Sequence, residues 1–156
     1  MGSIGTETHT ELPHFPLPKP PPCRICRSSR TIKLTVHPSN PNGNASRQYY
    51  ICLQCKSGSK SSSGHYGLNA HEVGWVSWAD NRGIHKDNPR CNCGVVSRQD
   101  RAGVDSSRPG MGFWTCATGA CGYYSEFANG LTLEEAQRRE DWPAGLGYEG
   151  FWPWLL

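Results

Sequence analysis

Cys23-Arg-Ile-Cys26 and Cys52-Leu-Gln-Cys55 are the two stretches of sequence on which the fold depends. Each places two thiols on one tight turn, where backbone amides turn back toward the sulfurs and stabilise thiolates. Four thiolates brought together in this way form a tetrahedral metal site that can hold a small domain together. The sequence therefore predicts a first metal site at Cys23, Cys26, Cys52 and Cys55.

The remaining cysteines form a second group with similar surroundings. They are Cys91, Cys93, Cys116 and Cys121. A disulfide between Cys91 and Cys93 would be strained, whereas two thiolates on a tight turn can share one cation. Two adjacent aromatic residues and one further residue precede the third cysteine of each group, as Tyr49-Tyr50-Ile51 and as Phe113-Trp114-Thr115. The pattern indicates a tandem repeat with one metal site in each copy.

Zinc is the metal that this pattern favours, with two Zn²⁺ ions per chain. Four sulfurs do not by themselves separate zinc from iron, and disulfides are a further alternative. His65 or His71 is an alternative ligand that would replace one cysteine of the first site. Ligation by four cysteines leaves no open coordination position, which indicates a structural rather than a catalytic metal.

Composition supports two small domains instead of one large core. The chain has 156 residues, 18 Gly, 12 Pro and only 36% apolar residues, so neither half can bury much surface. The N-terminus does not resemble a secretory signal, and no apolar run is long enough for a membrane span. We expect no membrane association and an intracellular location, with the nucleus as one compartment that fits.

The residue pattern predicts a small, metal-stabilised, β-rich fold with irregular ends. Residues 31–36 alternate polar and apolar side chains and are expected to pair with residues 47–52. Residues 98–112 are polar and contain several glycines, so we expect an irregular loop there. Thr132-Leu-Glu-Glu135 is a capping box that predicts a short helix over residues 133–141.

The second cysteine group has the outline of a known family. Cys91-Asn-Cys93-Gly94, Gly110-Met-Gly-Phe113-Trp114-Thr-Cys116 and Cys121-Gly-Tyr123-Tyr124 resemble the GRF-type zinc finger, whose pattern is CxCG, GRxF and CxFFxW. Met111 stands where the family has arginine, and Glu126 stands where it has tryptophan. The resemblance covers about residues 88–127.

The first group fits the same outline. Ser46-Arg47-Gln48-Tyr49-Tyr50-Ile51-Cys52 keeps the arginine but replaces the glycine, and Trp75-Val-Ser-Trp78-Ala-Asp80 resembles the family's FFxWxD segment. The resemblance thus implies two tandem, diverged GRF-like zinc ribbons. The expected organisation is a disordered proline-rich arm at 1–21, a first ribbon at 22–82 with an inserted Ser/Gly loop at 56–74, a second ribbon at 88–127, and a short helix plus aromatic tail at 131–156.

Charge is distributed unevenly along the chain. Residues 12–71 contain Lys and Arg but no acidic residue, which favours contact with phosphates, although a solvated basic face is the alternative. The family resemblance implies single-stranded DNA as ligand and assigns a role to Arg47, and aromatic rings can stack on unpaired bases of DNA or RNA. The expected nucleic-acid-binding residues are Arg24, Arg27, Arg30, Lys33, Arg47, Tyr49 and Tyr50. Arg98, Arg101 and Arg108 are candidates for a smaller basic patch.

A protein-interaction adaptor with purely structural zinc is the alternative function. The six prolines of residues 12–22 favour an extended segment that an aromatic groove could bind. The aromatic tail at 145–156 either folds back on a ribbon or presents an apolar peptide to a partner. No catalytic constellation is recognisable, so the sequence predicts a protein that is not an enzyme.

Overall fold

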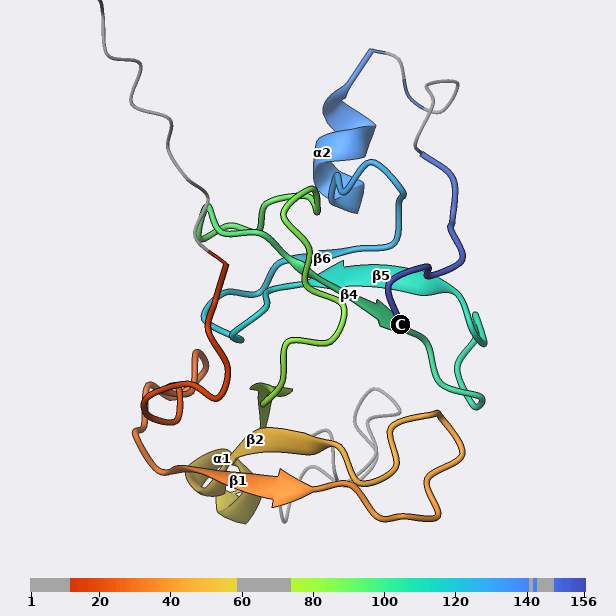
Figure 1. Cartoon of the computed structure of the whole chain (residues 1–156). Helices are drawn as coiled ribbons and strands as arrows, with labels where there is room; N and C mark the ends of the chain where they lie inside the picture. Colours follow the sequence, from red (N-terminus) through yellow and green to blue (C-terminus); the bar gives the residue numbers. More distant parts are fainter. Residues whose placement is uncertain (1–11, 59–73, 141, 143–147) are drawn as a thin grey trace, which may run out of the picture.

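Two small antiparallel sheets, one above the other, form the framework of the molecule (Figure 1). The computed structural model describes residues 12–58, 74–140, 142 and 148–156. Two short helices complete it, α1 at Leu53–Gly58 and α2 at Leu133–Arg138. Among these residues, neither helix has the length and apolar character needed to cross a bilayer. The architecture confirms the predicted β-rich fold with a short helix near the C-terminus.

The first sheet contains β1 (Thr31–Thr35), β2 (Gln48–Cys52) and β3 (Trp75–Trp78), hydrogen-bonded in that order. The predicted hairpin between residues 31–36 and 47–52 is confirmed. The third strand was not predicted, because a long insertion separates it from β2 in the sequence. Helix α1 begins directly after β2 and was also not predicted. Of the expected loop, residues 59–73 lie outside the described part of the chain.

The second sheet contains β4 (Arg98–Arg101), β5 (Gly112–Thr115) and β6 (Tyr124–Ser125) in the same simple order. The expected irregular loop over residues 98–112 is therefore wrong for Gly112, which begins β5, and for the first four residues of that range. Their polar side chains concealed the strand, since Arg98 and Gln99 are buried and have polar partners within the protein.

Neighbouring aromatic residues lie on opposite faces of their strands, as expected. Tyr50 keeps only 3% of its surface exposed and packs beside the first cysteine cluster, whereas Tyr49 is half-buried on the other face. In β5, Trp114 is buried against the second cysteine cluster and Phe113 faces the opposite way, half-buried. Each sheet thus uses one aromatic ring to cover its metal site.

The C-terminal tail folds back over the second sheet. Phe151 stacks on Trp114 with ring centroids 5.0 Å apart, and its carbonyl accepts a hydrogen bond from the amide of Gly112 at 2.7 Å. The amides of Trp154 and Leu155 both donate to Oε1 of Gln99 at 2.8 Å. Of the two arrangements expected for this tail, the structure shows the folded one.

Helix α2 begins at the predicted capping box. Thr132 Oγ1 accepts from the amide of Glu135 at 3.2 Å and donates to the carboxylate of the same residue at 3.0 Å. The helix ends at Arg138, before the predicted residue 141, because the backbone of Arg139 is extended. Residues 141 and 143–147 lie outside the described part of the chain.

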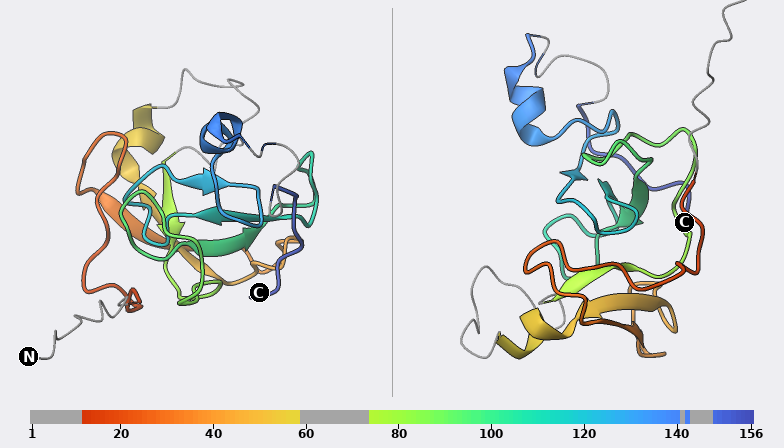
Figure 2. Two further views of the ribbon diagram at one scale, coloured as in Figure 1. Left: turned by 90° about the horizontal axis from the view of Figure 1, so that it is seen from above. Right: turned by 90° about the vertical axis from the view of Figure 1, so that its left-hand side faces the viewer.

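The described part of the proline-rich arm, residues 12–22, contacts both sheets instead of remaining free. Leu17 packs against the first cysteine cluster, and the carbonyl of Pro21 accepts from Thr31 Oγ1 at 2.7 Å. Phe15 lies near the guanidinium of Arg98, 5.2 Å from its central carbon to the ring centroid. The arm accordingly passes from the second sheet to the first (Figure 2). The expectation of disorder is wrong for residues 12–21, and residues 1–11 lie outside the described range.

The packing of the tail predicts different effects for two neighbouring aromatic residues. We expect Phe151→Ala to lower the free energy of unfolding by about 3–5 kcal/mol, because it leaves a cavity over Trp114. Trp152 is 68% exposed, so Trp152→Ala should change the free energy of unfolding by less than about 0.5 kcal/mol. Urea unfolding at fixed free zinc measures both. Equal effects would contradict the folded position of the tail.

Candidate metal centres and the contact between them

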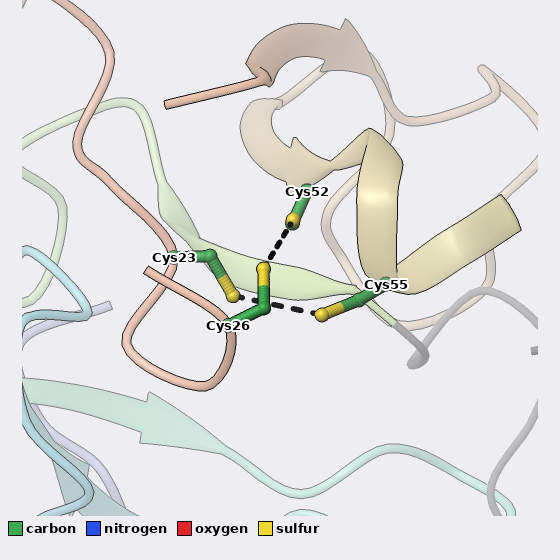
Figure 3. A group of neighbouring side chains, drawn as sticks. All are labelled: Cys23, Cys26, Cys52 and Cys55. Carbon is green, nitrogen blue, oxygen red and sulfur yellow. Dashed lines mark hydrogen bonds between the residues drawn. The ribbon is translucent and has the colours of Figure 1, made fainter. Parts of the chain in front are cut away.

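The first cysteine cluster gathers sulfurs from three local structures. Cys23 and Cys26 lie on the turn before β1, Cys52 ends β2, and Cys55 lies in α1 (Figure 3). Sγ of Cys23 is 3.8 Å from that of Cys55, and Sγ of Cys26 is 3.5 Å from that of Cys52. A tetrahedral zinc ion with Zn–S bonds of about 2.3 Å separates its sulfurs by about 3.8 Å. The cluster therefore fits zinc.

The second cluster repeats this geometry beside the second sheet. Its sulfurs all lie within 4.8 Å of one another, and Sγ of Cys91 is 3.8 Å from Sγ of Cys116. Cys91 and Cys93 lie on a turn, Cys116 follows β5, and Cys121 precedes β6. Cys93 is exposed, whereas Cys91 and Cys116 are buried. This cluster fits a second zinc ion with one ligand at the surface.

Local backbone amides favour the thiolate in each cluster. Burial opposes ionisation of Cys23, but backbone hydrogen bonds from Cys26 and Ile25 outweigh it and lower the pKa of the thiol to about 7. Burial likewise opposes ionisation of Cys116, and backbone hydrogen bonds from Cys121 and Thr118 lower its pKa to about 7. One thiolate per cluster thus forms readily near neutral pH, which is the starting point for metal binding.

Two thiols in each cluster have a raised pKa and ionise readily only beside a cation, namely Cys52 and Cys55 in the first and Cys91 and Cys93 in the second. Burial, followed by the neighbouring Cys26 and Cys23 sulfurs, raises the pKa of Cys55 to about 12. Burial and neighbouring sulfur atoms also raise the pKa of Cys93. A bound divalent ion reverses this repulsion, so metal binding releases protons.

The geometry decides between most of the ligand alternatives. All eight cysteines are free, so disulfides are not formed. His65 and His71 lie outside the described residues, and four cysteines complete the first site without them. Iron shares the preference for four thiolates, whereas the resemblance of the sequence to GRF-type zinc fingers favours zinc.

The comparison with protein families identifies the first unit. Residues 20–82 match the model of the GRF-like zinc ribbon domain. The first ribbon is a GRF-like zinc ribbon. The match extends through β3, so the segment after the insertion belongs to the same domain. The second cluster stands beside a comparable three-stranded sheet, in keeping with a second ribbon. Searches of curated proteins and of solved structures gave no match.

One carboxylate joins the two ribbons. Asp80, just after β3, accepts from Nε and Nη2 of Arg47 at 2.6 and 2.9 Å, and its Oδ1 also accepts from Nη1 of Arg98 at 3.0 Å. Arg47 lies over the ring of Trp78, with 3.8 Å from its central carbon to the ring centroid. The indole of Trp78 in turn donates to Asp100 of the second ribbon at 2.7 Å.

The charges of this contact depend on one another. Burial would raise the pKa of Asp80, but the hydrogen bond and charge of Arg47, with the charge of Arg98, hold the pKa below its usual value. Burial is the main cause that lowers the pKa of Arg98 to about 10, which still leaves the side chain charged at neutral pH. Asp80 therefore compensates two arginines, one from each ribbon.

The structure separates the expected nucleic-acid-binding residues into two groups. Tyr49 is half-buried against Trp75, whereas Arg47 and Tyr50 are 7% and 3% exposed and face protein partners. Direct contact with a ligand does not suit Arg47 or Tyr50, because each already has neighbours inside the fold. The exposed members of the set are Arg24, Arg27, Arg30 and Lys33.

The smaller basic patch expected in the second ribbon does not form. Arg98 is 1% exposed within the contact between ribbons. Arg108 pairs with Glu126 at 2.8 Å, and Arg101 donates to the backbone carbonyl of Asn42 at 3.0 Å. Residue spacing alone did not reveal these partners. One signal was present in the sequence, because Asp80, at the end of the Trp75–Asp80 segment, is an acidic residue that could pair with an arginine.

We expect two zinc ions per chain, and we expect replacement of a ligand in one site to release the zinc ion of that site alone. Cys52→Ser should lower the zinc content from two equivalents to about one and unfold the first ribbon, because a buried ligand is lost. Cys116→Ser should do the same to the second ribbon. Metal analysis after gel filtration gives the count. A chain that retains two equivalents in either variant would contradict the assigned ligands.

The Asp80 contact predicts a pH-dependent stability difference. Asp80→Asn should lower the free energy of unfolding by about 2–4 kcal/mol, less than for a fully buried pair because the carboxylate keeps some solvent contact. The pKa of Asp80 is lowered in the folded protein. The difference in free energy of unfolding between parent and variant should therefore be largest above the ordinary carboxyl pKa, and it should decrease as the pH falls through the lowered pKa. Asp105→Asn, at an exposed loop position, is the control. Equal stabilities at neutral pH would contradict this role.

Proposed function

We propose that the protein binds single-stranded nucleic acid through the exposed cations of the first ribbon, and that its zinc ions serve the fold. The observation that carries the proposal is the set of cations beside the first metal site. Arg24, Arg27, Arg30 and Lys33 are all exposed. Among the described residues, none of their side chains has an acidic partner within salt-bridge distance.

These cations lie around the first metal site. Arg24 and Arg27 lie within and directly after the Cys23–Cys26 turn, and Lys33 pairs across the sheet with Tyr50. Because cross-strand partners project to the same face, Lys33 lies on the face that covers the cysteine cluster. Exposed cations that have no acidic partner within the described part of the chain are available to replace the counterions of a phosphate backbone.

The first ribbon also has partly exposed rings that suit a single strand, on the face of its sheet opposite Lys33. Tyr49 and Trp75 are half-buried and stacked at 5.0 Å, so part of each ring remains accessible. Stacking on unpaired bases needs such partly exposed rings and does not require a particular sequence. We infer a preference for single strands over duplexes, with either DNA or RNA as ligand.

We further infer that the protein acts by binding and not by catalysis. Each metal cluster supplies four sulfurs, and a zinc ion with four thiolates has no position left for water or substrate. The metal then holds the turn that carries Arg24 and Arg27. Loss of zinc is therefore expected to abolish binding along with the fold of the first ribbon.

A protein-interaction adaptor is the second candidate, and the tail favours it. Trp152 and Trp154 remain 68% and 62% exposed although the tail is folded back. Large exposed aromatic side chains are enriched at protein interfaces. In this alternative the partner contacts the tail, and the basic surface of the first ribbon has no specific ligand.

Fluorescence anisotropy over a salt series tests the proposal. The zinc-loaded protein should bind a labelled single strand of about 20 nucleotides more tightly than the duplex, with affinity falling steeply as salt rises. The double variant Arg27→Glu/Lys33→Glu should bind more weakly and reduce the slope of log affinity against log salt by about 0.7 per lost phosphate contact.

Lys86→Glu is the charge-matched control for the single variant Lys33→Glu, since Lys86 is exposed but lies between the ribbons in the sequence. It should retain most of the affinity of the parent protein. No binding by fully metallated protein at low salt would exclude nucleic acid and favour the adaptor. An equal loss in both charge variants would indicate a general charge effect instead of the surface assigned here.

A further inference from the structure

A cleft of about 170 Å³ lies between the two ribbons. β3 forms one wall, at the side of the first sheet that faces the second (Figure 2). The other wall comes from the second ribbon, where Arg98, Thr115 and Tyr124 occupy neighbouring positions on one face of its sheet. The cleft therefore exists only because the two ribbons are held together.

Aromatic rings line this cleft from both sides. Trp75 and Trp78 come from β3, and Tyr124 comes from β6. Tyr124 is 48% exposed, and its ring is supported from the side by Phe113 at a centroid distance of 5.4 Å. An exposed ring held in place by a second ring is a ready surface for stacking.

A cation lies at the edge of the same cleft. Arg24 of the first ribbon lines it, and a Cβ placed on Gly122 of the second ribbon would be 3.8 Å from Nε of Arg24. Arg24 thus extends from the turn of one metal site to the turn of the other. Its charge is placed for an anion that approaches the cleft from solvent.

A buried donor in the wall of the cleft is unpaired. Arg98 uses Nη1 and Nη2 for Asp80 and for backbone carbonyls, but its Nε has no hydrogen-bond partner among the described residues. Because this atom is closed to solvent, it belongs to the interior of the wall and is not a contact for a ligand in the cleft.

The volume limits what can enter. A cavity of about 150 Å³ holds one benzene ring. The cleft is slightly larger, which suits one six-membered heterocycle such as a pyrimidine base, whose ring also carries carbonyl oxygens. A purine has two fused rings and would extend beyond the cleft.

We propose that the cleft between the ribbons receives one unpaired pyrimidine base of the bound single strand. The base stacks on Tyr124, and Arg24 contacts the adjoining phosphate. This inference rests on the proposed function and adds a role for the second ribbon, which supplies Tyr124. It also explains why the two ribbons need a fixed contact.

Removal of the ring tests the stacking. Tyr124→Ala should bind a thymidine 20-mer about 5- to 150-fold more weakly than the parent, and the loss should be smaller for an adenosine 20-mer. On an abasic oligomer of the same length, the variant and the parent should bind equally. Trp152→Ala removes a more exposed ring outside the cleft and should leave binding unchanged.

A charge placed on the opposite wall tests Arg24 without truncating it. A Cβ at Gly122 makes only ordinary contact, so a side chain there is tolerated. Gly122→Asp puts a carboxylate beside Arg24 and should weaken binding about tenfold, whereas Gly122→Asn has a similar shape without the charge and should bind like the parent. Zinc content of two equivalents shows that each variant is folded.

The outcomes separate this inference from the proposed function. If the parent binds single strands and both Tyr124→Ala and Gly122→Asp bind equally well, the cleft is not the site, although the basic surface still stands. Equal losses for thymidine and adenosine oligomers would overturn the choice of a pyrimidine. If the parent binds no single strand, both proposals fail.

Discussion

Four sulfurs in each half of the chain are the constraint on which the rest of the structure depends. The core around each metal site is small, and cysteines make up much of it, together with the ring of Tyr50 in the first ribbon and those of Trp114, Tyr123 and Phe151 in the second. Such cores bury too little apolar surface to order domains of this size without a staple. Zinc supplies the staple, and it also fixes the turns that carry the exposed cations. Fold and proposed function thus share one chemical requirement.

Asp80 imposes the second constraint, because it compensates arginines from both ribbons at once. A buried arginine is costly unless it is paired, so separating the ribbons would leave Arg98 without its carboxylate. The arm and the tail reinforce the arrangement, the arm by contacting both sheets and the tail by covering Trp114. The two ribbons therefore form one body, and residues from both are available to a single ligand.

The sequence predicted those features that depend on local pattern. The cysteine spacing located both metal sites, alternation located β1 and β2, and Thr132 with Glu135 located the start of α2. Features that depend on distant partners were not predictable in this way. Arg98 appeared to be a surface cation, yet its partner Asp80 belongs to the other ribbon. β4 appeared to be a loop because Gln99 is polar, yet the residue is buried and its Oε1 accepts hydrogen bonds from two amides of the tail. Arg47 matched a family position, but its neighbours could be identified only in three dimensions.

The contact between the ribbons has a further consequence for solubility. β3 is the last strand of its sheet, and such an edge presents unpaired backbone groups that can recruit a strand from another molecule. Here the turn at Gly119 lies against this edge so closely that a Cβ at that position would collide with the carbonyl of Val76. Gly119 also has φ +73°, which favours glycine. The second ribbon thus shields the first from edge-to-edge self-association. A first ribbon isolated from it would keep its zinc ligands but would present an open strand edge to its neighbours.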